Sequence, residues 1–205
     1  MSLIQDYNDD IWTRGWRMFT TSKKELENMF VGTGTMQIIE NNIVIRDYPF
    51  EPSRAYHEQI FKLSDINNIS VTSRPFSIQV QGELIFVSTE NKSELLTFAH
   101  KNHIPLVGRS YVWSWILEPF LDTDYSTETD ERLTLLLAKA GLSEERIFEL
   151  RQEVKTQMLK YNFDTMLWEW VNLDVFDVLR AMRTNYDKEQ FSDFYKRAMA
   201  IALMD

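Results

Sequence analysis

Residues 76–103 read FSIQVQGELIFVSTENKSELLTFAHKNH, and the spacing of their apolar residues changes part-way along. Between Phe76 and Val80, apolar and polar residues alternate. This alternation predicts a strand with one face on a core and the other in water. After about Ser88 the spacing changes to three and four, beginning at Leu95, which predicts a helix. We therefore expect a sheet that is closed by one helix.

More strands are expected on the N-terminal side of this stretch. Residues 35–39 and 43–48 flank Glu40-Asn41-Asn42, which is a hairpin signal because Asn tolerates the left-handed turn conformation. Further strands are predicted at residues 59–63, 69–73 and 84–88. The expected result is an antiparallel sheet or barrel with its closing helix over residues 31–106.

Residues 1–30 are predicted to form a helical extension. Ser22 and Glu25 match a capping box, in which each side chain satisfies a free backbone amide of the other residue. Trp12 and Trp16 need apolar cover, and the helical part of the chain offers more aromatic residues than the sheet. We therefore expect this extension to lie across the helical part.

The chain from residue 107 to residue 205 is predicted to be helical throughout. Gly141 is placed to end one helix, and Ser143 to cap the next. A further helix is expected to start at Asn172, and a last helix after the Asp187 cap. The buried stripes of the second and the last of these helices are expected to be Ile147, Leu150, Val154 and Met158, and Phe191, Phe194, Tyr195, Ala198 and Met199. The fold class is therefore α+β, with an all-α C-terminal helical bundle that forms a separate domain.

Composition and charge exclude several classes of function. The 205 residues carry a formal net charge of −9 and contain no cysteine, so disulfides, thiolate zinc sites and cysteine nucleophiles are excluded. Neither half has the basic excess that binding to a nucleic-acid backbone requires. No signal peptide and no run of 18 apolar residues is present. We expect a cytoplasmic protein that neither inserts into membranes nor binds nucleic acid.

Residues from about 34 to 103 resemble a bacterial pleckstrin-homology-like (PH-like) domain. The resemblance rests on Phe61-Lys-Leu-Ser-Asp65-Ile66, the strands 76–80 and 84–88, and the helix that follows Asn91. Together with the helical part, which begins with Trp113-Ser-Trp, the chain looks like a bacterial family of unknown function. The resemblance implies a fold and no reaction.

Phosphoinositide binding is disfavoured by the first hairpin. Members of the wider PH-like fold that bind these lipids use Lys and Arg around this hairpin. Here the hairpin turn is Glu40-Asn41-Asn42, and Arg46 is the only cation nearby.

An acidic run after Pro119 is the candidate metal site. Asp122, Asp124 and Glu128 place oxygen ligands at intervals that suit a hard divalent cation such as calcium. The run lacks the glycine and the final glutamate of a calcium-binding loop, since Thr127 and Leu133 stand at those positions. The alternative is a solvated linker whose acids favour the N-terminus of the next helix. No cofactor is predicted, with a divalent cation as the alternative.

Tryptophan residues are the candidate ligand-binding side chains. Trp113 and Trp168 each begin a Trp-x-Trp pair and could stack on a small ligand, and Arg109 could contribute a polar contact. The alternative is core packing, because large aromatic residues dominate the buried surface of small domains. His100 and His103 are three residues apart, and a zinc site would need a third ligand such as Glu94 or His57.

These observations favour a non-enzymatic interaction module that binds a protein partner or a second copy of itself. One alternative is a metal-dependent or carboxylate-based enzyme that uses the acids of residues 118–130. A second alternative is a binder of small ligands between the two halves. On balance we expect no enzymatic activity, and no residue is predicted to be catalytic.

Overall fold

The computed structural model describes residues 22–121, 125–164 and 172–204. The chain divides into two compact units. The helical unit takes its described residues from 22–30 and 111–186, and the sheet unit takes them from 31–110 and 187–204. Each unit has its own core, so each is described separately.

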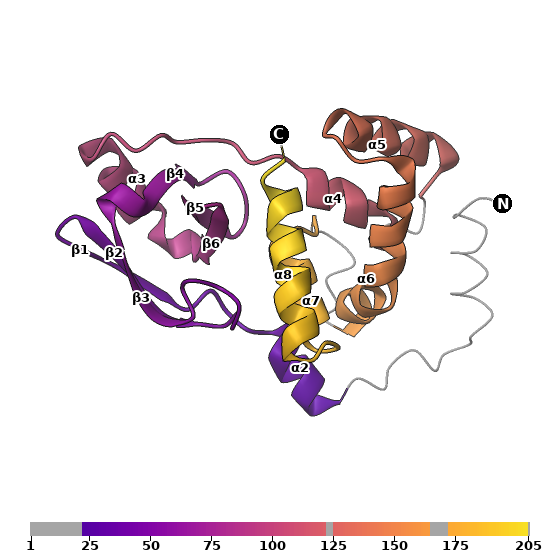
Figure 1. Cartoon of the computed structure of the whole chain (residues 1–205), viewed down its shortest axis with the longest axis horizontal. Helices are drawn as coiled ribbons and strands as arrows, with labels where there is room; N and C mark the ends of the chain where they lie inside the picture. Colours follow the sequence, from indigo (N-terminus) through magenta and orange to yellow (C-terminus); the bar gives the residue numbers. More distant parts are fainter. Residues whose placement is uncertain (1–21, 122–124, 165–171, 205) are drawn as a thin grey trace. The chain divides into compact units, whose positions relative to one another are not determined.

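The first sheet of the sheet unit is antiparallel, and its strands lie in the order β1-β2-β3 (Figure 1). A tight turn joins the first two strands, and its residue Glu40 adopts a positive φ of 57°. The predicted hairpin is therefore present, although a glutamate rather than an asparagine takes the left-handed conformation. The strands are β1 (Thr35–Ile39), β2 (Asn42–Tyr48) and β3 (His57–Lys62).

The second sheet is also antiparallel, with the order β4-β5-β6. Gln81 and Gly82 form the two-residue turn between its last two strands, both with positive φ. Pro105 and Val107 cover the outer edge of β4 through backbone hydrogen bonds to Ile69. The strands are β4 (Ile66–Ser70), β5 (Phe76–Val80) and β6 (Glu83–Val87).

The helix after the second sheet is α3 (Lys92–Lys101), and it begins where the apolar spacing changes. Leu95, Phe98 and Ala99 form its buried face. The helix ends before Pro105, because the residue before a proline avoids the helical region. Asn91 precedes the helix, but its side chain makes no capping hydrogen bond. A short 3-10 turn over Thr89–Asn91, capped by Ser88, leads into the helix instead.

The last helix, α8 (Lys188–Ala202), packs in the sheet unit. The Phe50 ring lies 6.2 Å from the Phe191 ring and 5.9 Å from the Tyr195 ring. Tyr195 also donates a hydrogen bond to the buried carboxylate of Glu83 at 2.7 Å. The sequence predicts that this helix belongs to a helical bundle over 107–205. In the structure the apolar stripe of α8 packs in the sheet unit instead. The predicted stripe itself is confirmed, because all five of its residues are buried.

The helical unit is built from two segments of the chain. Met29 of the N-terminal segment is fully buried, and Glu25 lies 4.0 Å from the Lys160 ammonium in the same unit. The expectation for Trp12 and Trp16 lies outside the described residues. The elements are α2 (Lys23–Met29), α4 (Val112–Leu117), a 3-10 turn at Glu118–Phe120, α5 (Thr127–Lys139), α6 (Glu144–Asp164) and α7 (Val175–Arg183).

Helix ends in this unit follow the predicted signals with one exception. The capping box of Ser22 and Glu25 is formed, and Ser143 accepts the Arg146 backbone N–H at 3.2 Å. Gly141 adopts a φ of 95° just after α5. The helix expected to start at Asn172 is capped by Asp174 instead, which accepts the backbone N–H of the next residue at 2.6 Å.

The α+β class is confirmed. Two three-stranded antiparallel sheets occupy the first half of the chain, and most helices follow them. Within the described residues the two sheets do not join into a closed barrel. The described helices also include none that is both long enough and apolar enough to span a bilayer.

Candidate functional site

The two described residues that were predicted to bind a ligand make contacts inside their own units instead. Trp113 is 1% exposed in α4 and packs in the helical unit. Arg109 lies in the sheet unit, where its guanidinium donates to Ser77 Oγ at 3.0 Å and Asn68 Oδ1 at 2.7 Å. Trp168 lies outside the described residues. The structure therefore does not bring Trp113 and Arg109 together in one pocket of either unit.

The acidic run is described only in part, since Asp122 and Asp124 lie outside the described residues. Glu128 is exposed in the first turn of α5. Ser126 caps that helix by accepting the Thr129 backbone N–H at 3.1 Å. Among the described residues no group of three or more His, Asp or Glu side chains is arranged to hold a metal ion. The described part of the run thus serves the start of a helix.

The histidines are also spread over separate positions of the sheet unit. The His57 ring is tilted by 48° to the Tyr56 ring, with ring centroids 4.0 Å apart. His100 and His103 are exposed at the end of α3. In the described structure they belong to no metal-ligating group.

The described residues of α5 and α6 line a groove, which we call the α5–α6 groove. These two helices are neighbours in the helical unit (Figure 1). The groove has a volume of about 560 Å³, and its upper walls are formed by Glu131, Thr134 and Leu135 of α5 and by Glu144 and Phe148 of α6. On α6, positions four residues apart lie on the same side of the helix, so Glu144 and Phe148 both face α5.

Two large apolar side chains in this groove are exposed. Leu135 is 65% exposed and Phe148 is 48% exposed. Their neighbours Leu133 and Ile147 are each only 3% exposed and form the core beneath. Scattered apolar residues on a surface are ordinary, whereas these two side chains line one concavity.

The groove is also lined by a part-buried ion pair between Arg151 and Asp130. Arg151 is 4% exposed and donates to Asp130 Oδ1 at 2.7 Å. The same arginine donates to the Ile116 carbonyl at 3.3 Å and to Tyr125 Oη at 3.3 Å. Removing Asp130 would leave the buried Arg151 charge without its ion-pair partner, so the pair stabilises the contact between α5 and α6. Burial and the hydrogen bond to Asp130 raise the pKa of Tyr125 above its ordinary value, so this residue stays neutral.

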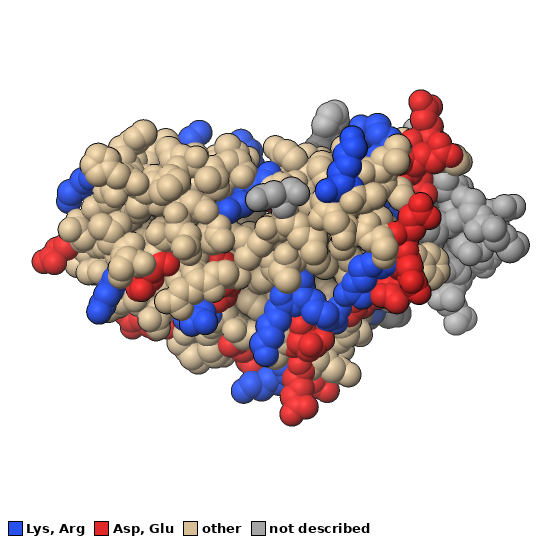
Figure 2. Space-filling view, turned by 45° about the horizontal axis from the view of Figure 1, so that its top comes forward, with Lys and Arg blue, Asp and Glu red and all other residues tan. Residues whose placement is uncertain are grey.

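The rim of the groove is acidic. Glu131 and Glu144 are exposed at its edges, whereas the one arginine in its lining is neutralised by Asp130. In Figure 2 acidic side chains gather in a band over the part of the helical unit that contains α5 and α6. The field in the groove therefore favours a cationic partner.

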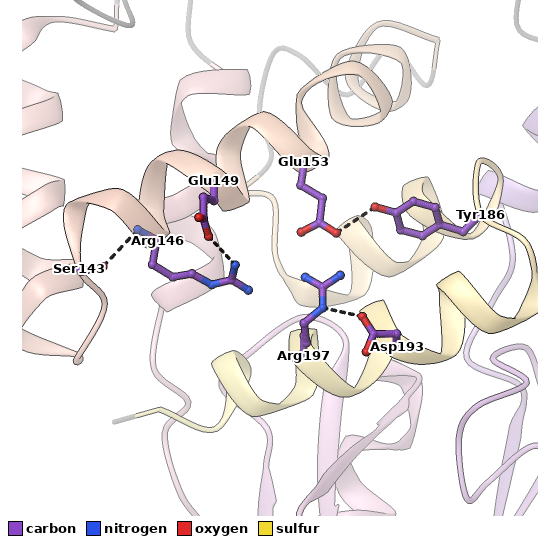
Figure 3. A network of polar contacts seen from close by, with 7 residues as sticks. All are labelled: Ser143, Arg146, Glu149, Glu153, Tyr186, Asp193 and Arg197. Atoms are coloured by element: carbon purple, nitrogen blue, oxygen red, sulfur yellow. Dashed lines mark hydrogen bonds and ion pairs between the residues drawn. The ribbon is translucent and has the colours of Figure 1, made fainter.

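A different face of α6 carries charges that are paired locally. Figure 3 shows Arg146 turned toward Glu149 on the same helix, at 2.8 Å. Glu153 accepts a hydrogen bond from Tyr186 at 3.0 Å, which ties α6 to the residues after α7. These pairs satisfy the polar face of α6, whereas the groove face combines acids with an exposed aromatic ring.

A second cluster of titratable groups lies inside the helical unit and serves its packing. Tyr161 donates to Asp177 Oδ1 at 2.8 Å and accepts from Arg180 at 3.1 Å. Burial raises the pKa of Asp174 to about 6, and burial also raises the pKa of Asp177. The two aspartates form the capping box of α7. Their polar atoms are thus committed to the start of that helix and to its contact with α6.

No protein-family model, curated protein or solved structure shows a significant match to this chain. The PH-like resemblance of the first half therefore stays a prediction.

The α5–α6 groove is not among the sequence-predicted sites. The signal for it is the run Leu135-Leu136-Leu137. Consecutive positions on a helix are about 100° apart, so three leucines in a row cannot all face one core. Phe148 beside the buried Ile147 gives the same signal on α6. Sequence alone does not show that Leu135 and Phe148 line the same groove.

Proposed function

We propose that this protein is an interaction module that binds a segment of a partner protein in the α5–α6 groove. The observation that carries this proposal is the convergence of Leu135 and Phe148, both substantially exposed, on one concavity of about 560 Å³. A volume of this size suits a few side chains of a peptide segment. The expected non-enzymatic role is part of the same proposal.

The charge of the groove defines the chemistry of the segment. An apolar side chain inserted between Leu135 and Phe148 would have Glu131 and Glu144 on either side of it. Lys or Arg residues that flank the apolar residue would meet these carboxylates, and a segment rich in Asp or Glu would be repelled. We therefore expect the partner segment to be amphipathic and basic, which is a common chemistry for helices that bind in grooves.

The size of the contribution from Phe148 follows from its exposure. An aromatic side chain presents about 150–250 Å² in total, so covering the exposed 48% removes about 100 Å² from water. At about 25 cal/mol per Å² this contributes about 2.5 kcal/mol before the entropy of ordering is subtracted. Loss of the ring should therefore weaken binding by about 1–2 kcal/mol, which is about 5- to 30-fold in Kd.

The test is binding of a fluorescein-labelled amphipathic peptide of Leu and Lys, followed by fluorescence anisotropy. We expect the wild-type chain to bind it, and both Phe148→Ser and Leu135→Ser to bind it about 5- to 30-fold more weakly. Binding should also weaken as salt is added, because the rim charges are exposed and screened.

The matched control is Phe30→Ser. Phe30 also belongs to the helical unit and is 55% exposed, but it does not line the groove. Its loss should leave the Kd unchanged. Equal weakening by Phe30→Ser and Phe148→Ser would show non-specific hydrophobic adsorption, and tighter binding of a Leu and Glu peptide would contradict the charge argument.

A further inference from the structure

The edge strands of the two sheets differ in the hydrogen bonds that their outward-facing backbone groups make. At the edge of β1, the Ile38 backbone N–H donates to the Glu94 carboxylate at 3.3 Å. At the edge of β6, the Phe86 backbone N–H donates to Tyr48 Oη at 3.1 Å. The edge of β4 is covered by backbone hydrogen bonds between Ile69 and residues 105–107. A backbone segment that pairs along an edge, as at β4, protects a sheet from pairing with other chains.

The edge of β3 has no such cover among the described residues. The strand is the outer member of its sheet and contains no proline (Figure 1). The Lys62 N–H donates to the Asp65 carboxylate at 2.9 Å, and the Ile60 carbonyl accepts from the Gln59 side chain at 3.3 Å. Both contacts are local. They also show that the even-numbered residues direct their backbone groups away from β2, since both groups of such a residue point to the same side.

The side chains of the same residues are exposed. Ile60 is 54% exposed at the centre of the strand, with Glu58 and Lys62 exposed on either side of it. Successive side chains alternate between faces, so these three lie on one face. An acid, an apolar residue and a base at equal intervals form a self-complementary pattern when the strand is turned end to end.

We propose that β3 pairs with β3 of a second copy of this chain, antiparallel and with Ile60 opposite the partner's Ile60. In this register Glu58 faces the partner's Lys62, and Lys62 faces the partner's Glu58. Twofold symmetry therefore gives two ion pairs on either side of a central apolar pair. A shift by one residue would place each exposed side chain opposite a core-facing one. A shift by two residues would place Glu58 or Lys62 opposite Ile60, so neither ion pair would form.

The neighbours of β3 are compatible with this arrangement. Glu58 Oε1 accepts from Arg46 Nε at 2.7 Å, and a carboxylate can accept a further hydrogen bond from the partner's Lys62 through its second oxygen. On the opposite face of the strand, a groove of about 270 Å³ is lined by polar residues that include Arg54 and Gln81. The partner's Gln59, which lies opposite Phe61 in this register, would enter a polar space there.

The experiment is sedimentation velocity of the full chain over a range of concentrations up to about 1 mM, where a Kd of that order is still measurable. We expect a dimer of about 49 kDa, twice the 24.4 kDa of the chain. Glu58→Lys alone and Lys62→Glu alone should each raise the Kd about 10-fold or more, because symmetry repeats each like-charge contact. An equimolar mixture of the two variants should restore the dimer, since both ion pairs form again between unlike chains.

Ile60→Pro supplies a second variant. It removes an N–H that points away from β2, so it should abolish the dimer with little change in circular dichroism. A monomeric wild type at all concentrations would overturn the proposal. So would a dimer that both charge reversals leave intact, or two folded single variants whose mixture stays monomeric. The α5–α6 groove lies in the other unit, so its peptide affinity should not change in any of these variants.

Discussion

The hydrogen bond between Tyr195 and Glu83 tests the packing of α8 on the sheet unit. Tyr195 Oη donates to Glu83 Oε1 at 2.7 Å, and Glu83 is only 8% exposed. Tyr195→Phe removes the donor and keeps the ring, which still packs against Phe50. A hydrogen bond to a buried charged group contributes about 1.5–3 kcal/mol. We therefore expect the free energy of unfolding to fall by about 2 kcal/mol.

The assay is urea unfolding followed by two probes. Far-UV circular dichroism reports on both units. Residues 31–110 and 187–205 contain no tryptophan, so tryptophan fluorescence does not report directly on the sheet unit. The lower stability of Tyr195→Phe should appear as a lower urea midpoint by circular dichroism. If the two units unfold independently, the urea midpoint measured by tryptophan fluorescence should not change.

Tyr186→Phe is the matched control for this prediction. Tyr186 donates to Glu153 at 3.0 Å in the helical unit, where the carboxylate is only half-buried. Its loss should therefore cost about 1 kcal/mol or less. The reasoning is refuted if Tyr195→Phe lies within about 0.5 kcal/mol of the wild type, the range typical of surface substitutions.

Two further predictions concern the pH dependence of stability and a glycine turn. Burial raises the pKa of Asp174 from 3.8 to about 6, so the folded chain holds this proton more tightly than the unfolded chain does. Stability from this group is therefore present below about pH 4 and is lost as the pH rises through about 6. Asp174→Asn should flatten that fall in urea unfolding measured from pH 4 to pH 7, and parallel curves for the two proteins would contradict the assignment. Gly34 has a φ of 69°, and a Cβ there would collide with the Arg46 carbonyl oxygen. Gly34→Ala should lower the free energy of unfolding by about 2 kcal/mol or more. Gly82→Ala should lower it by about 1 kcal/mol, because the φ there is 80° but the added Cβ would meet no neighbouring atom within 4 Å. Equal melting temperatures for the two glycine variants would count against this steric argument.

Local structure was largely predictable because it depends on nearby residues. The alternation from Phe76 to Val80 and the change of spacing after Ser88 correctly predict β5 and α3. The predicted water-facing side of β5 is wrong, because Ser77 is only 1% exposed and accepts a hydrogen bond from Arg109. The capping box of Asp187 and Gln190 is formed as the sequence indicates. These signals act over two to four positions, so a single sequence contains them.

The placement of α8 was not predictable in the same way. Its apolar stripe was correctly identified, but a stripe does not say which surface it covers. The covering surface includes Phe50, more than a hundred residues earlier in the chain. The residue that completes the contact is Glu83, whose burial in β6 has no local sequence signal.

For the candidate site too, local features were predictable from the sequence and tertiary contacts were not. The sequence directed attention to Trp113, which the structure buries in the core of the helical unit. The acids near Asp130 were interpreted as possible ligands, whereas Asp130 pairs with Arg151, which is 21 residues further along the chain. The α5–α6 groove combines that pair with Leu135 and Phe148, which come from different helices, so its lining is set by tertiary packing.

The most direct test of the proposed function is site-specific photo-crosslinking with benzoylphenylalanine in place of Phe148 or Phe30. Both positions are about half exposed in the helical unit, so they differ mainly in whether they line the groove. We predict that the basic amphipathic Leu and Lys peptide crosslinks at position 148 and that little adduct forms at position 30. Equal adduct yields at the two positions, or adducts at position 30 alone, would contradict the proposal that the α5–α6 groove is the binding site.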